Sequence, residues 1–269
     1  MKKSTTLNVK IILKATLFCI AFTGLFVAFS FFKSAVPPQF ERLAHGTIGT
    51  IAAFLTSYLF LKFDKKTFAD IGLMVEKTTL KNFFIGLLMG IALMGTLSLG
   101  LIYFSNFSIE TNKNSAFFNF FLCTLPFIPL AFMEEMGFRS YPLVLLKNTV
   151  GMRQAVIITA ILFGFYHIVN GWTLQTAFLG AGVWGIIYGV AALYSDGIAL
   201  PTGLHYAANL TTSAFGISDT SFNLWILKQK NGLSLENYES SQWAILIPQL
   251  IVLVLGVILM EWHVRKQRI

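Results

Sequence analysis

The chain has little charge for its length. Only 12% of its 269 residues are charged, about half the share found in an average soluble domain, and 55% are hydrophobic. This composition excludes an ordinary soluble domain. It predicts an integral membrane protein, with the lipid bilayer as its surroundings.

Cysteine is almost absent as well. The two cysteines, Cys19 and Cys123, both fall inside long apolar segments and lie far apart in the sequence. This placement excludes a disulfide framework and a zinc site built from several cysteines. We expect both thiols to be buried among apolar side chains.

Basic residues outnumber acidic ones and give a net charge of +8, but their distribution argues against nucleic-acid binding. Most of them fall on one side of an eight-span arrangement: Lys2, Lys3, Lys10, Lys14, Lys62, Lys65, Lys66, Lys77, Lys81, Lys147, Arg153, Arg265, Lys266 and Arg268. The other side has only Lys33, Arg42, Lys113, Lys228 and Lys230. The positive-inside rule therefore predicts a multi-pass cell-membrane protein with both termini in the cytoplasm. The lysine-rich loops and compact length are typical of a bacterial protein.

Long apolar runs recur along the chain, and each can cross about 30 Å of hydrocarbon as a helix. The predicted fold is all-α, a polytopic transmembrane helical bundle forming one integral-membrane domain over residues 1–269. The eight predicted spans are 11–32, 43–62, 82–104, 117–147, 153–171, 174–194, 198–217 and 243–262. In the long fourth span we expect kinks at Pro126, Pro129 and Pro142. The longest polar loop, 218–241, is predicted to be a solvated external connector.

Three charged residues, Glu134, Glu135 and Arg139, interrupt the fourth apolar run in the sequence MEEMGFR. A charge at mid-membrane costs on the order of 2.5–3.5 kcal/mol, so such residues usually serve a function. Glu135 precedes Arg139 by four residues, in the orientation that favours an ion pair on one helix face. Glu134 is rotated about 100° away from that face. We therefore assign Glu135 and Arg139 a structural role, and Glu134 the role of a possible general base.

Two further pairs of residues share a helix face in other spans. Phe163 precedes His167 by one turn, and His205 precedes Asn209 by one turn. A single histidine or asparagine in a membrane helix more often forms an interhelical hydrogen bond than a catalytic site. The combination with two glutamates on a third span favours a shared site.

Depth along the helices gives a check on whether these residues meet. If the chain turns near residue 150, Glu134 and His167 both lie about 25 Å from that turn, at matching height on antiparallel helices. His205 lies only about 13 Å from the turn at residues 195–197. The sequence leaves open whether the span of His205 begins deeper or the site extends vertically.

In this order, Glu134-Glu135-x-x-x-Arg139, Phe163-x-x-x-His167 and His205-x-x-x-Asn209 resemble the signature of the CPBP family. That family comprises type II CAAX prenyl endopeptidases and bacterial bacteriocin-processing and immunity proteins. The Asp-Ile-Gly-Leu sequence at 70–73 is similar to a recurrent feature of the family.

The resemblance implies a CAAX-protease-like fold with a catalytic core at residues 117–217. It implies that Glu134 and His167 activate a water that attacks the scissile carbonyl, while His205 and Asn209 stabilise the oxyanion. Glu135, Arg139 and Phe163 would support the site.

The participation of a metal is left open by the sequence. Family members are commonly labelled metalloproteases, and Glu134, His167 and His205 are residue types that bind zinc. The His-Glu-x-x-His spacing of zinc proteases is absent, and the same residues serve equally well for metal-free activation of water. We expect no tightly bound metal.

The leading hypothesis is an intramembrane endopeptidase that hydrolyses a peptide bond of a membrane-associated peptide or protein. Nothing in the chain identifies a prenylated substrate. The alternative is a non-proteolytic immunity or scaffold protein that binds a partner in the same cavity. A proton-coupled transporter with Glu134 as relay is disfavoured, because no inverted repeat is visible.

Overall fold

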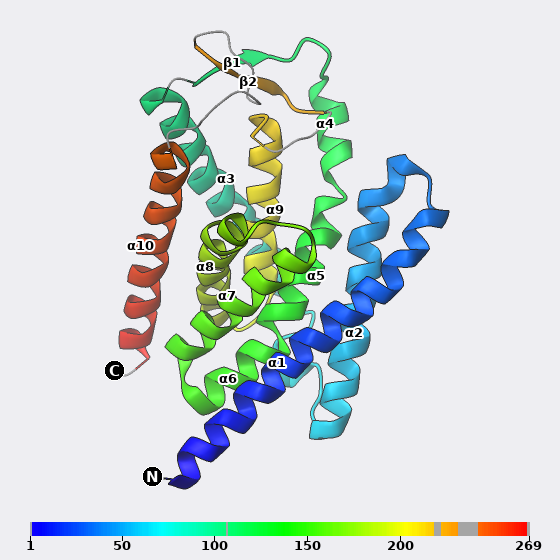
Figure 1. Cartoon of the computed structure of the whole chain (residues 1–269), viewed down its shortest axis with the longest axis vertical. Helices are drawn as coiled ribbons and strands as arrows, with labels where there is room; N and C mark the ends of the chain where they lie inside the picture. Colours follow the sequence, from blue (N-terminus) through cyan, green and yellow to red (C-terminus); the bar gives the residue numbers. More distant parts are fainter. Residues whose placement is uncertain (1, 106, 218–221, 231–241, 268–269) are drawn as a thin grey trace.

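The computed structural model describes residues 2–105, 107–217, 222–230 and 242–267. They form the helical membrane bundle that the sequence predicts (Figure 1). Seven helical segments of this described part are long and apolar enough to cross a membrane: Thr6–Ala35, Pro38–Asp64, Thr79–Phe104, Phe117–Val150, Met152–Val169, Thr176–Ser195 and Leu246–Lys266. The chain is a multi-pass membrane protein.

The first two long helices form a pair. α1 (Lys2–Ser30) and α2 (Glu41–Asp64) are joined by two short 3₁₀ turns, η1 (Phe31–Ala35) and η2 (Pro38–Phe40). At the end of α2, Asp64 accepts hydrogen bonds from Lys14 and from the Tyr141 hydroxyl. This network ties α1, α2 and the later helix α6 together.

The connector after α2 contains η3 (Ala69–Ile71) and leads to α3 (Thr79–Phe104). It carries the Asp-Ile-Gly-Leu sequence, in which Ile71 is buried and Gly72 has a φ of +72°. A Cβ at Gly72 would lie 2.9 Å from the carbonyl oxygen of Asp196. Glycine is therefore needed both for the backbone conformation and for the contact with the turn at 195–197.

The fourth apolar run forms three helices. These are α4 (Phe117–Thr124), α5 (Phe127–Arg139) and α6 (Tyr141–Val150), with breaks at residues 125–126 and at Ser140. Pro126 stands at the first break and Pro142 at the start of α6, as expected for residues that cannot donate a backbone hydrogen bond. Pro129 lies in the first turn of α5, where the missing N–H costs little. Figure 1 shows α6 lying across the lower end of the bundle, so 117–147 is not one continuous span.

The remaining helices are α7 (Met152–Val169), the π-helical η4 (Thr176–Gly182), α8 (Val183–Ser195), α9 (Ala199–Ala214) and α10 (Gln242–Lys266). α9, predicted as a span over 198–217, is only 16 residues long. A Cβ at Gly203 would lie 2.0 Å from the Phe83 carbonyl oxygen, which shows that α9 packs closely against α3. The position of α9 is therefore set by this packing.

A two-stranded ribbon lies over the upper end of the bundle (Figure 1). β1 (Phe107–Thr111) pairs antiparallel with β2 (Trp225–Gln229), with Phe107 opposite Gln229 and Thr111 opposite Trp225. These strands were not predicted from the sequence, in which β2 falls within the predicted solvated connector 218–241. Most of that loop, 218–221 and 231–241, lies outside the described residues.

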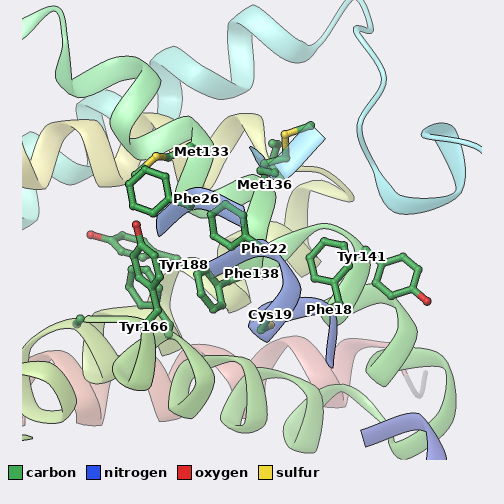
Figure 2. Packing of buried hydrophobic residues seen from close by; sticks show 14 of the residues in the cluster. Phe18, Cys19, Phe22, Phe26, Met133, Met136, Phe138, Tyr141, Tyr166 and Tyr188 are labelled. Atoms are coloured by element: carbon green, nitrogen blue, oxygen red, sulfur yellow. The ribbon is translucent and has the colours of Figure 1, made fainter. Parts of the chain in front are cut away.

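Aromatic side chains of α1 fill the core of the bundle (Figure 2). Phe18, Phe22 and Phe26 recur every four residues and are almost fully buried. The Phe22 ring lies 5.8 Å from that of Phe138 on α5 and 5.9 Å from that of Tyr166 on α7. α1 therefore fixes α5 and α7 relative to each other.

Cys19, between these rings in Figure 2, is buried as predicted. The prediction for Cys123 was wrong, because that thiol is exposed on α4. An apolar face of a membrane helix can look outward to lipid as well as inward to the core.

Candidate active site

Three helices bring ionisable side chains together inside the bundle. α5 supplies Glu134 and Glu135, α7 supplies His167, and α9 supplies His205. All four are buried, with exposed fractions between 0% for Glu135 and 8% for His167. Such burial requires that each charge or ring nitrogen find a partner within the protein.

His205 lies between the two adjacent glutamates. Its Nδ1 is 2.8 Å from Oε1 of Glu135, and its Nε2 is 3.6 Å from Oε2 of Glu134. A carboxylate can only accept, so Nδ1–H donates to Glu135 and the orientation of the ring is fixed. Nε2 is the nitrogen that faces Glu134.

Glu135 also forms the predicted ion pair with Arg139. The Arg139 Nε lies 3.4 Å from Oε2 of Glu135, and both side chains are fully buried. The Nη2 group of Arg139 donates to the Gly185 carbonyl at 3.3 Å. A Cβ at Gly185 would lie 3.0 Å from this group, so a glycine there makes room for the guanidinium.

The expected division of roles between the glutamates needs a correction. The sequence analysis gave Glu135 only the pair with Arg139, whereas the structure also joins it to His205. Glu134, expected to lack Arg139 as a partner, lies at ion-pair distance from the same histidine. The helical spacing of Glu135 and Arg139 gave no information about a contact across helices.

Aromatic rings enclose the polar groups. Tyr188 of α8 stacks on His205, with centroids 4.5 Å apart and planes 13° from parallel. Phe163 presents its face to the Arg139 guanidinium at 4.1 Å and lies edge-on to His205 at 6.2 Å. These contacts lower the cost of burying the guanidinium and hold the imidazole ring in place.

His167 stands on the other side of Phe163. Its Nδ1 donates to the Phe163 carbonyl at 2.9 Å, because a carbonyl can only accept. This bond leaves Nε2 free to act as an acceptor. The Glu134 carboxylate is near enough to interact electrostatically with the His167 imidazole. The rings of Tyr166 and Trp172 contact His167 at 5.3 and 4.5 Å between centroids.

The predicted depth of Glu134 relied on an incorrect assumption about its helix. It assumed a straight helix from Glu134 to residue 150, but the helix breaks at Ser140 and α6 turns aside. Glu134 therefore lies six residues before the break at Ser140. His205 likewise lies six residues after Ala199, the first residue of α9. This break resolves the mismatch in height that the sequence left open for His205.

Asn209 lies one turn beyond His205 on α9 and is partly buried. Among the described residues, no hydrogen bond or ion pair joins its side chain to the other site residues. Its role stays a prediction.

The predicted zinc ligands do not converge as a metal site. Among the described residues, no group of three or more His, Cys, Asp or Glu side chains is arranged to hold a metal ion. Nδ1 of His205 is bonded to Glu135 and Nδ1 of His167 to a carbonyl, which leaves Nε2 of each ring as the atom that could bind a metal. In the described part of the chain, Glu134, His167 and His205 nevertheless do not form a group that could hold a metal ion.

Three site residues were missed from the sequence: Tyr166, Trp172 and Tyr188. Aromatic residues make up 15% of the chain, so residue type alone gave no signal. Gly185 and Gly189 did give a signal in the sequence, because small residues four apart predict close contact between helices. That contact is present, and at Gly185 the neighbour is Arg139 of the site.

Comparison with known protein families finds one similarity. Residues 115–211 match the family described as type II CAAX prenyl endopeptidase Rce1-like. This part of the chain is similar to that family. The matched segment runs from just before α4 into α9, and so contains Glu134, Glu135, Arg139, Phe163, His167, His205 and Asn209. The family that this segment resembles is one of endopeptidases. None of the curated proteins matches it.

Proposed function

We propose that the chain is an intramembrane endopeptidase that hydrolyses a peptide bond of a membrane-associated peptide or protein. The observation that carries the proposal is the convergence of Glu134, His167 and His205 from three helices inside the CAAX protease segment. A bilayer excludes water from most of its depth, so a buried polar cluster of this kind suits chemistry on a substrate that arrives from the membrane.

Glu134 is the proposed general base. Its partners are neutral or titratable imidazoles, whereas the neighbouring Glu135 is committed to Arg139. Glu134 and Nε2 of His167 would hold a water between them, take its proton as it attacks the carbonyl and return that proton to the leaving amine.

His205 is proposed to stabilise the oxyanion. Because Nδ1–H is bonded to Glu135, Nε2 can donate to an oxyanion only when the imidazole is protonated at both nitrogens. A carboxylate lies on each side of the ring, Glu135 at 2.8 Å from Nδ1 and Glu134 at 3.6 Å from Nε2. Asn209, one turn away, is the proposed second donor.

The proposed mechanism contains no step through a metal. Water activation needs only the Glu134 carboxylate and the His167 imidazole. We expect full activity after exhaustive dialysis against a chelator. Loss of activity, with restoration by added zinc, would contradict this part of the proposal.

Orientation in the membrane is also a proposal. The start of α1 and the end of α10 lie toward the same end of the bundle (Figure 1), together with the lysine-rich connector between α2 and α3. The positive-inside rule then places this end in the cytoplasm of a bacterial cell. We propose no nucleic-acid partner.

The decisive test uses purified protein in lipid nanodiscs. The probes are a farnesylated peptide ending in a CAAX sequence, the same peptide without the lipid, and a membrane-anchored peptide library read by mass spectrometry. Glu134→Gln should reduce cleavage by about 10²–10⁴-fold while the protein stays folded. Glu110→Gln, the same change at an exposed ribbon residue paired with Lys228, should leave cleavage unchanged.

The alternative function predicts a different outcome. If the chain is an immunity or scaffold protein, no probe is cleaved, and its protective or partner-binding phenotype persists in Glu134→Gln and in His167→Ala. Loss of that phenotype in either variant favours the protease.

A further inference from the structure

The connection between α7 and η4 differs from the other helix connections near the site. Residues 169–176 are all exposed, although His167, two residues earlier, is almost fully buried. Gly171 has a φ of +90°, and a Cβ there would find open space. The segment VNGWTLQT carries no charged side chain but has polar ones at Asn170, Thr173, Gln175 and Thr176.

Figure 1 places this connection partway along the bundle, well below the upper ends of α3, α4 and α9. The segment joins two helices that are each long and apolar enough to cross a membrane, Met152–Val169 and Thr176–Ser195. It therefore forms an exposed connection beside the buried His167.

Trp172 lies in this exposed connection and contacts His167. Its indole lies edge-on to the imidazole, with centroids 4.5 Å apart, and its backbone N–H donates to the His167 carbonyl at 3.0 Å. Trp172 is 46% exposed, whereas His167 is 8% exposed. The other aromatic neighbours of His167, Phe163 and Tyr166, are buried and form the inner wall.

We propose that Trp172 controls access to His167 from the exposed side of this connection and selects, by size, the uncharged part of a substrate that passes it. The selection of substrate rests on the proposed function, whereas the control of access does not. An indole in contact with the imidazole obstructs bulky groups more than it obstructs water. The absence of charge along 169–176 favours apolar or neutral substrate residues.

Access is tested without any substrate, by modifying histidines with diethyl pyrocarbonate in nanodiscs and following each site by mass spectrometry. His263, also buried but on α10, serves as an internal reference. Trp172→Ala should raise the rate at His167 several-fold relative to His263, and Trp172→Phe should raise it less. An unchanged ratio in Trp172→Ala would overturn the proposal.

Two control variants separate removal of the indole from general loosening. Leu174→Ala truncates an exposed side chain of the same connection, and Tyr103→Ala removes an exposed aromatic ring on α3. Both should leave the ratio of His167 to His263 unchanged. A rise in Leu174→Ala equal to that in Trp172→Ala would mean that the connection as a whole, and not the indole, shields His167, and would overturn the proposal.

Selection is tested by comparing kcat and KM for the farnesylated peptide and its unlipidated form. Trp172→Ala should shift the kcat/KM ratio toward the bulkier peptide, mainly through KM. An unchanged ratio would overturn the selection by size. If the unsubstituted protein cleaves no probe, the proposed function fails, whereas the histidine modification still decides the question of access.

Discussion

His205 is held at 2.8 Å by Glu135 through Nδ1 and faces Glu134 at 3.6 Å through Nε2. The adjacent glutamates thus act on opposite nitrogens of one ring. Arg139 neutralises Glu135 from the far side, which makes a buried chain of alternating charge from Arg139 to Glu134 when His205 is protonated. The position of the proton on His205 is therefore set by Glu135.

The first prediction concerns Glu135→Gln. An amide keeps the shape but gives His205 a weaker acceptor, so the doubly protonated imidazole loses its support. We expect kcat to fall by about 10²-fold, with KM nearly unchanged, since the loss affects the transition state. The pH dependence of kcat should also shift, which a merely structural role would not produce.

The control for this prediction is Glu135→Ala. Truncation leaves the buried Arg139 guanidinium with no acceptor in place of the carboxylate, a change that typically costs about 3–5 kcal/mol, whereas glutamine keeps an amide oxygen that can accept from it. We expect this variant to lose folded protein in a thermal unfolding assay, whereas Glu135→Gln stays folded. Equal activity of Glu135→Gln and the unsubstituted protein would refute the role assigned to Glu135.

The second prediction concerns Gly185→Ala on α8. The new methyl group would lie 3.0 Å from the Arg139 guanidinium and 3.2 Å from the Ala160 backbone, so α8 has to move away from α7. We expect a loss of about 1–3 kcal/mol in the free energy of unfolding, as for other overpacked cores. Thermal unfolding in nanodiscs measures it.

Gly95→Ala on α3 is the matched control, because nothing lies within 4 Å of the added Cβ. Alanine is the better helix former, so this variant should be as stable as the unsubstituted protein or more stable by about 1 kcal/mol. If both variants lose the same stability, close contact at Gly185 is not the cause.

Local spacing explains what the sequence revealed about this site. The ion pair of Glu135 and Arg139 follows from a separation of four residues on one helix, and the spans follow from the length of their apolar runs. Both depend only on neighbours along the chain, where helix geometry is known in advance.

Contacts between helices required information that the sequence did not show. The meeting of His205 with both glutamates depends on the break at Ser140. The φ and ψ of Ser140, −93° and −105°, do not follow from the sequence around it. Tyr188 and Trp172 were hidden among 8 tyrosines and 5 tryptophans, most of which suit a membrane bundle for other reasons.

The third prediction concerns Gly203→Ala on α9. A Cβ there would lie 2.0 Å from the Phe83 carbonyl oxygen of α3, and backbone cannot move aside as a side chain can. α9 would shift together with His205, two residues further on. We expect cleavage to fall by at least about 10²-fold, since misplacement by 1 Å at a reacting group has effects of this size.

The readout that separates this effect from unfolding is the yield of folded protein by size-exclusion chromatography. Gly100→Ala on α3 has open space around the added Cβ and should keep full activity. A fully active Gly203→Ala protein would show that the contact between α3 and α9 does not position His205.

The last prediction concerns topology. Val75 lies in the exposed connector between α2 and α3, and Asn114 lies in the exposed segment between β1 and α4, toward the opposite end of the bundle. A Cys123→Ser background removes the exposed native thiol and retains buried Cys19. A membrane-impermeant maleimide should label Asn114→Cys in intact cells, and Val75→Cys only after permeabilisation. Because the basic residues gather at the Val75 end, the reverse pattern would place those charges outside the cell, against the rule from which the orientation was inferred.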